Sequence, residues 1–261
     1  YLSEEKIQTK RTMVSILAMV VGCFSKAVYI PFLALYWLMP KDKFYSRRQK
    51  NLFKAGIFVL LILMFASFIL PLIGNVTSGA EVGDYRGGDT SQTSQLSMIL
   101  GYPLTYAGVL LKSLGTTFAS YFIGSKVLAN FAYRGIYDGI GYFVVLLTML
   151  FTFVTDFGMT EKTYDAQMKR KILMMKIWNA VLIFGTACLV WTALYLDFTP
   201  VGSMVINGVS PRYYLPLIFP LSLIFINQKV RCSMKLENYQ SLIAFLMLIG
   251  TGISIYCLML A

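Results

Sequence analysis

Histidine is absent from this 261-residue sequence, and acidic residues and cysteines number only 12 and four. Without histidine or a Cys-x-x-Cys pair, the sequence excludes zinc or haem ligation of the usual kinds and general-base catalysis by histidine. It also has no recognisable hydrolytic triad, no glycine-rich phosphate loop and no carboxylate pair within an apolar run. The cysteines lie in or beside apolar segments without paired spacing, which is typical of small packing residues. They are Cys23, Cys188, Cys232 and Cys257.

Charged residues of either sign are scarce, at 13%, whereas 57% of the residues are hydrophobic and the mean hydropathy is +0.66. This composition is too apolar for a soluble domain with a solvated surface. The formal charge of +11 comes from basic residues in short loops between apolar runs, a pattern typical of positive-inside membrane topology rather than of nucleic-acid binding. We therefore predict an all-α, polytopic transmembrane protein with about five to seven membrane segments, forming a single transmembrane domain over residues 1–261.

Apolar runs of suitable length predict where the chain crosses the membrane. The predicted spans are residues 55–74, 138–155, 177–196, 213–226 and 241–259. The basic loops 41–54 and 156–176 are predicted to be cytoplasmic.

The first apolar stretch, residues 12–40, is interrupted near Gly22 and again at Pro31. Because both of its flanks are basic, we favour a hairpin of two short helices that enters the membrane and returns, with Lys26 near its tip. A single kinked span is the alternative.

Residues 75–137 are predicted to lie outside. Residues 75–95 form a polar, acidic loop, and the parity of the neighbouring spans requires residues 96–137 to cross the membrane an even number of times. Amphipathic helices lying on the outer surface are the simplest arrangement, and a re-entrant pair is the alternative.

The stretch from Ile206 to Pro220 places Arg212 after a turn and at the start of an apolar run. A charge inside a bilayer costs several kcal/mol, so this arginine requires interfacial water or an anionic partner. Two interpretations stay open. Arg212 is an interfacial anchor, with Tyr213 and Tyr214 in the aromatic belt, or its planar guanidinium binds a phosphate through two hydrogen bonds.

If the polar residues of the outer face converge, they form a polar pocket at the outer leaflet. No local spacing enforces this convergence. Asp197, at the end of a span, is interpreted as a solvated cap. We assign no catalytic residue and no metal ligand in this chain. The candidate residues for binding a lipid phosphate or substrate are Arg212, Tyr213, Arg86, Gln95, Asp84 and Lys26.

Three segments carry a resemblance to a known family: residues 84–103, Ser25-Lys-Ala-Val-Tyr-Ile-Pro31, and residues 198–217 with Ser210-Pro-Arg-Tyr-Tyr214. They resemble the bacterial membrane-protein family called domain of unknown function 2142, across nearly all of the chain but only in the later part of the family. Those proteins look like type C glycosyltransferases, multi-span enzymes that take a sugar from a polyprenyl-phosphate carrier at the outer face of the membrane.

The resemblance implies a multi-pass protein of the bacterial cytoplasmic membrane that acts in cell-envelope polysaccharide synthesis. Its implied partners are a polyprenyl-phosphate sugar donor, a glycan acceptor and the lipid bilayer, with no nucleic acid. In the superfamily the catalytic acid lies in the first outer loop, so we expect it upstream of Tyr1, and a divalent cation would belong with that loop. No other cofactor is expected.

The arginine motif departs from the family pattern Gln-Gly-Arg-Tyr-Phe, because only Arg212 and Tyr213 match. Pro211 removes a backbone donor, which leaves the Arg212 side chain as the expected phosphate contact. Two other functions stay open. The interrupted stretch 12–40 and the prolines of the span 213–226 are also typical of a non-catalytic lipid or glycan carrier or flippase, and a structural membrane subunit is the third reading.

Overall fold

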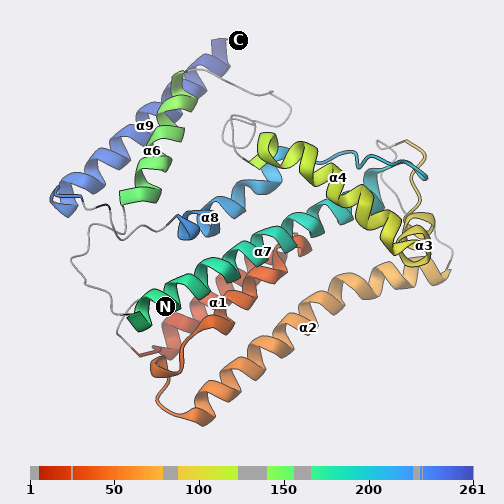
Figure 1. Ribbon diagram of the computed structural model, residues 1–261, viewed down its shortest axis with the longest axis horizontal. Helices are drawn as coiled ribbons and strands as arrows, with labels where there is room; N and C mark the ends of the chain where they lie inside the picture. Colours follow the sequence, from red (N-terminus) through yellow and green to blue (C-terminus); the bar gives the residue numbers. More distant parts are fainter. Residues whose placement is uncertain are drawn as a thin grey trace. The chain divides into compact units, whose positions relative to one another are not determined.

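The computed structural model describes residues 6–24, 26–78, 88–122, 140–155, 166–225, 230 and 232–260. Every regular element in these residues is helical, which confirms the all-α prediction (Figure 1). The chain forms two compact units: residues 1–110 with 184–208, and residues 111–183 with 209–261. The helices α4 (Pro103–Phe122) and α7 (Ala166–Phe198) each contribute to both units.

The first unit begins with α1 (Thr9–Phe24), followed by the 3-10 helix η1 (Ala27–Leu38). Lys26 lies between them, is exposed, and precedes the first turn of η1. The two helices pack side by side, and the hydroxyls of Ser15 on α1 and Tyr36 on η1 are hydrogen bonded to each other. Residues 9–38 thus form a helical hairpin, whose entry into a membrane stays a prediction.

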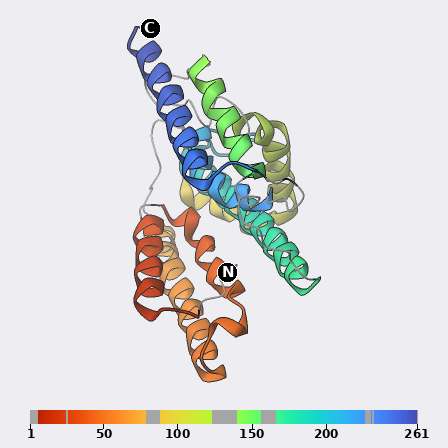
Figure 2. The same cartoon turned by 90° about the vertical axis from the view of Figure 1, so that its left-hand side faces the viewer.

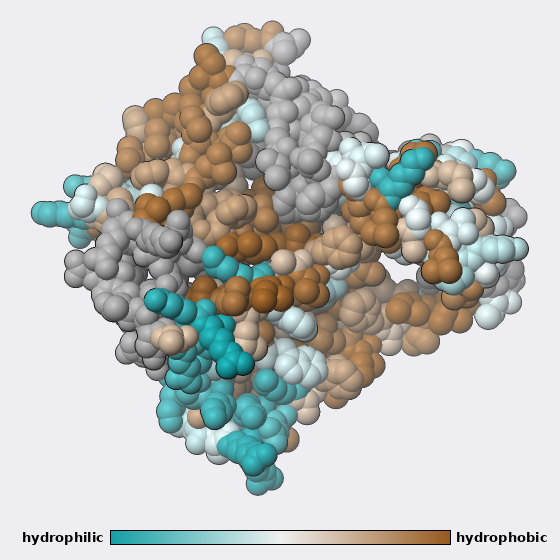
Figure 3. All heavy atoms as spheres, in the orientation of Figure 1, coloured by the Kyte–Doolittle hydropathy of each residue, from teal (hydrophilic) through white to brown (hydrophobic). Residues whose placement is uncertain are grey.

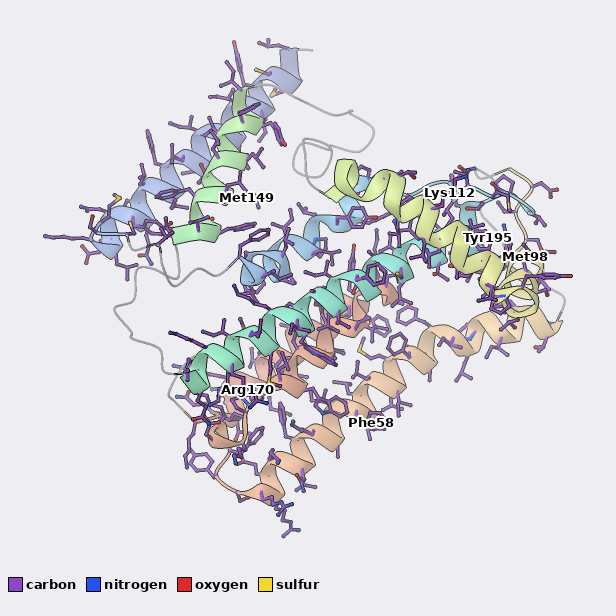
Figure 4. All side chains as sticks on the ribbon, viewed as in Figure 1. Phe58, Met98, Lys112, Met149, Arg170 and Tyr195 are labelled. Carbon is purple, nitrogen blue, oxygen red and sulfur yellow. The ribbon has the colours of Figure 1, made fainter. Side chains whose placement is uncertain are left out.

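This hairpin packs against α2 (Arg47–Ser78) through an apolar core. The buried members of the core are Cys23, Ile30, Leu33 and Met64. The ring of Phe58 on α2 (labelled in Figure 4) makes an edge-on contact with the ring of Trp37 on η1, and the ring centroids are 5.8 Å apart.

The helix α2 extends the predicted span 55–74 at both ends, so the basic loop 41–54 and the polar loop 75–95 are each shorter than predicted. At its start, Ser46 Oγ accepts a hydrogen bond from Gln49 N at 3.1 Å, and Gln49 Oε1 accepts one from Tyr45 N at 2.8 Å. This near-reciprocal capping begins the helix among polar residues. At 32 residues the helix is ~48 Å long, more than a hydrocarbon core of ~30 Å requires.

Two helices occupy the region where the sequence left the topology open. The helix α3 (Gln92–Gly101) is capped by Ser91, whose side chain accepts from Ser94 N, and α4 follows at Pro103. Gln95 therefore lies within a helix and not in a polar loop, and its side chain is fully buried. Whether α3 and α4 lie on a membrane surface stays a prediction.

The helix α7 is 33 residues long and starts 11 residues before the predicted span 177–196. One face of it is buried at the three- and four-residue spacing of a helix. Its fully buried side chains include Asn179, Thr186, Trp191 and Tyr195. A largely apolar helix with polar side chains turned inward is typical of a helix whose buried face has protein neighbours.

In the second unit, α6 (Ile140–Thr155) packs along α9 (Leu236–Leu260), and both views show the two side by side (Figures 1 and 2). Glycine permits this close approach, since a Cβ built on Gly141 would lie 2.5 Å from Gly250 O and 2.4 Å from Ser254 Oγ. At the other end of the pair, the hydroxyls of Thr155 and Tyr239 are 2.9 Å apart.

The predicted span 213–226 is not one helix. It divides into the 3-10 helix η6 (Pro211–Leu217) and the seven-residue α-helix α8 (Ile218–Ile224). Pro216 lacks the backbone N–H that an α-helix would require at this position, which favours the tighter 3-10 turn before α8 begins.

Three helices in the described ranges are long and apolar enough to cross a membrane: Arg47–Asn75, Ala166–Phe198 and Leu236–Cys257. Ile140–Thr155 and Ala27–Leu38 are apolar but shorter. Many large apolar side chains along these helices are exposed (Figure 3). Exposed apolar surface of this extent suits a lipid environment, while the count of five to seven membrane segments stays a prediction.

Candidate functional site

Polar side chains of α3 bind the segment that follows α7. Gln95 Nε2 donates hydrogen bonds to two backbone carbonyls, Thr199 O at 2.9 Å and Pro200 O at 3.1 Å. One turn earlier on the same face, Gln92 Nε2 donates to Asp197 Oδ1 at 2.5 Å. We call residues 88–95 and 197–208 together the α3–α7 joint.

Two hydrogen bonds donated by backbone amides also hold the joint. Val201 N donates to Asp89 O at 3.0 Å, and Asn207 N donates to Thr199 Oγ1 at 3.1 Å. The Thr199 hydroxyl donates in turn to Leu194 O at 3.0 Å. The segment after α7 is therefore held in a defined shape even though it has no regular structure.

Two glycines make this shape possible. Gly208 has φ +79°, and a Cβ built on it would lie 2.3 Å from the Phe198 ring. Gly88 has φ +94° and faces Pro200, where a Cβ would lie 3.8 Å from Pro200 Cγ. Both positions use the left-handed region that glycine adopts without steric cost.

An aromatic pair supports the joint from the side of α4. The ring of Tyr195 (labelled in Figure 4) has its centroid 5.0 Å from that of Tyr106, and Tyr106 OH lies 2.6 Å from Thr192 Oγ1. Because the Thr192 hydroxyl donates to Cys188 O, the tyrosine is the donor in this pair. Burial raises the pKa of the Tyr106 hydroxyl, so it stays protonated in the neutral range.

Two acceptors in the joint have no hydrogen-bond donor among the described residues. Gln92 Oε1 and Gln95 Oε1 are both buried, and neither has a hydrogen-bond partner in the described part of the chain. A buried acceptor without a donor costs about 1–3 kcal/mol. Both oxygens are therefore acceptors that no described residue uses.

Arg212 belongs to the second unit, in the first turn of η6. Its side chain is exposed, and its guanidinium carbon lies 5.7 Å from the centroid of the Tyr213 ring. No carboxylate within salt-bridge distance of Arg212 is found among the described residues. Tyr213 is half-buried and Tyr214 is fully buried, so Tyr214 is not an exposed member of an aromatic belt as one reading of the sequence expected.

The predicted site residues fall in three places. Gln95 and Lys26 are in the first unit, the former buried in the joint and the latter at the turn of the hairpin. Arg212 and Tyr213 are in the second unit. Asp84 and Arg86 lie outside the described residues, and convergence of the whole set stays a prediction.

Gln92 is not among the residues predicted from the sequence, and Asp197 was expected to be a solvated cap, whereas the two are hydrogen bonded. The available signal was the three-residue spacing of Gln92 and Gln95, which puts two amides on one face of a helix. No local pattern links them to residue 197. In the described ranges, no group of three His, Cys, Asp or Glu side chains is arranged to hold a metal ion, and the divalent cation expected with a further loop stays a prediction.

Comparison with known proteins adds one finding. Residues 1–221 match the model of a family described as "Predicted membrane protein (DUF2142)". The matched range includes both the α3–α7 joint and Arg212. No curated protein and no solved structure matches the chain.

Proposed function

The chain belongs to the DUF2142 family of predicted membrane proteins, and from this premise we propose that it is part of a membrane glycosyltransferase. The enzyme would take a sugar from a polyprenyl-phosphate donor at the outer face of the membrane and build or modify a cell-envelope glycan. In this proposal Arg212 binds the donor phosphate. The type C glycosyltransferase fold and a total of five to seven spans are parts of the same proposal.

The observation that carries the proposal is the state of Arg212. Its guanidinium is exposed, it has no carboxylate partner in the described residues, and it packs only loosely over Tyr213. A guanidinium that is not neutralised by the protein is available to an anion, and its fork of N–H groups matches two phosphate oxygens. Pro211 contributes no backbone donor, so the side chain alone makes the contact.

The joint supports a different role for Gln95. Its amide N–H groups already bind Thr199 O and Pro200 O, which leaves only the oxygen Oε1 for a ligand. An amide oxygen repels a phosphate and accepts a hydrogen bond from a hydroxyl. Because this side chain is fully buried, we propose that Gln95 positions the segment 199–208 and does not bind the phosphate.

No catalytic residue is assigned in the described part of the chain. The proposal places the general acid or base in another part of the enzyme and gives this part the task of holding the lipid donor and the acceptor. Asp84, Arg86, Lys26 and Tyr213 remain proposed contributors to that binding. The segment 199–208 ends four residues before Arg212 in the sequence.

The test is Arg212→Ala in the full-length protein, assayed in membranes with a mixed pool of radiolabelled polyprenyl-phosphate sugars. Loss of a charge-assisted phosphate contact should lower transfer by roughly 10- to 100-fold. Arg212→Lys keeps the charge without the fork and should retain intermediate activity, while Lys112→Ala serves as the control for removing an exposed cation. Unchanged transfer and unchanged donor affinity in Arg212→Ala would contradict the assigned role.

A carrier or flippase is the second candidate, and one observation favours it. Two segments, η1 and η6, are 3-10 helices that contain Pro31 and Pro216, and irregular helices often line transport paths in membrane proteins. Reconstituted protein that moves a polyprenyl-phosphate lipid across vesicles and transfers no sugar would favour this function over the enzyme.

A further inference from the structure

Basic side chains gather at one end of the first unit, where α1 and α2 both begin. Between residues 6 and 54 the only acid is Asp42, and Glu4 and Glu5 lie outside the described residues. We call the set the basic surface. It consists of the exposed Lys6, Lys10, Arg11, Lys41, Arg47 and Arg48, the half-buried Lys50 and Lys54, and the buried Lys43.

Tertiary contacts bring these two distant segments together. Ile7 N donates to Lys43 O at 2.9 Å, and Lys6 Nζ lies 4.8 Å from the centroid of the Tyr45 ring. The residues that precede α1 are thereby held against the residues that precede α2. Hydrophilic side chains accordingly gather over the start of α2 (Figure 3).

This arrangement is electrostatically unfavourable for the protein alone. The N-terminus of a helix is already positive and is stabilised by acidic residues, but neither α1 nor α2 has an acid in its first turn. Lys43 adds a cation that is only 6% exposed and has no carboxylate partner in the described residues. A bound anion with several negative charges would relieve the repulsion.

The neighbouring surface indicates what kind of anion fits. Directly after its cationic first turn, α1 exposes an apolar stripe in which Met13, Leu17 and Val21 are each more than 60% exposed. On α2, Leu52 is exposed between Lys50 and Lys54, and Phe58 is exposed one turn after Lys54. A soluble polyanion would contact only the cations, whereas a phospholipid places its phosphate against the cations and its acyl chains along this apolar surface.

We infer that the basic surface binds the headgroups of anionic phospholipids, with their acyl chains lying along the exposed faces of α1 and α2. The inference does not depend on the proposed glycosyltransferase activity. Each surface cation contributes about a fivefold factor to binding of an anionic membrane surface, and added salt weakens it.

The experiment uses the full-length protein in detergent, titrated with phosphatidylglycerol or with phosphatidylcholine. Bound lipid is counted by native mass spectrometry, and the thermal unfolding midpoint is recorded in parallel. The triple variant Lys41→Gln/Arg47→Gln/Arg48→Gln removes three exposed cations of the basic surface. The matched control, Lys112→Gln/Lys169→Gln/Lys235→Gln, removes three exposed cations elsewhere.

We expect phosphatidylglycerol, but not phosphatidylcholine, to bind and raise the midpoint, and the triple variant to weaken this binding by ~10- to 100-fold. The control should bind as the unsubstituted protein does. Equal losses in the two variants, equal binding of both lipids, or equal stabilisation by soluble glycerol phosphate would each overturn the inference. Equal midpoints of all three proteins in phosphatidylcholine would establish that the substitutions leave the fold intact.

Discussion

Gln92 on α3 binds Asp197 at the end of α7, across 105 residues of sequence, through a hydrogen bond from Nε2 to Oδ1. A neutral amide thus holds a carboxylate at the end of a largely apolar helix. One turn further along α3, Gln95 binds two carbonyls of the segment that follows. These two amides hold the end of α7 and the residues that follow it.

The substitution Gln95→Ala should lower the free energy of unfolding by about 2 kcal/mol, because it removes the donor from the buried carbonyl of Thr199 and from the partly buried carbonyl of Pro200. Thermal unfolding of the purified protein in detergent measures this. Ser97→Ala, an exposed position on the same helix, is the control and should change the midpoint little. If both variants unfold alike, the amide bonds of Gln95 contribute nothing to stability.

The glycine at 208 should be far less replaceable than the glycine at 202. Both have φ near +80°, so alanine at either costs about 1 kcal/mol in backbone strain. Only at 208 does the new Cβ also collide with the Phe198 ring, since nothing lies within 4 Å of a Cβ at 202. Gly208→Ala should therefore unfold at a clearly lower temperature than Gly202→Ala. The same midpoint for the two would contradict the close contact with Phe198.

The packing of α6 on α9 allows a similar comparison of two glycine substitutions, one at a close contact and one in open space. Gly141→Ala places a Cβ 2.5 Å from Gly250 O, a backbone atom that moves only with the helix, so the two helices should separate. Gly252→Ala on α9 has open space and should be neutral or slightly stabilising. Disulfide crosslinking between cysteines introduced along α6 and α9 would report the separation. Crosslinking that is as efficient in Gly141→Ala as in Gly252→Ala would refute the close approach.

Tyr106 provides a prediction about alkaline pH. Burial raises its pKa in the folded state, so above the unfolded-state pKa of about 10 the unfolded chain releases this proton first. The resulting stability is fully present below pH 10 and is lost as the pH rises above it. Tyr106→Phe should remove this part of the alkaline loss and also the hydrogen bond to Thr192, which lowers stability at neutral pH by about 1 kcal/mol. Unfolding midpoints measured between pH 8 and pH 11 test both effects, and parallel curves for the two proteins would contradict the first.

Apolar runs in the sequence did not predict where the helices begin and end. The sequence predicted a span over residues 55–74, but α2 continues from Arg47 to Ser78. The backbone hydrogen bonds of a helix do not depend on side-chain polarity, and the Ser46–Gln49 capping extends it into polar sequence. In the opposite direction, the apolar run 213–226 contains two prolines and yields η6 and α8 instead of one helix.

The sequence by itself determined that the protein is helical and too apolar to be an ordinary soluble domain, and it singled out Arg212 at the edge of an apolar run. These properties depend on composition and on local spacing, which one stretch of chain contains in full. Only the tertiary structure decided that Gln92 and Gln95 bind residues 197–200, that Gly208 lies against Phe198, and that the cationic starts of α1 and α2 meet. Such contacts join segments far apart in the sequence, and packing selects them from many partners that no local pattern distinguishes.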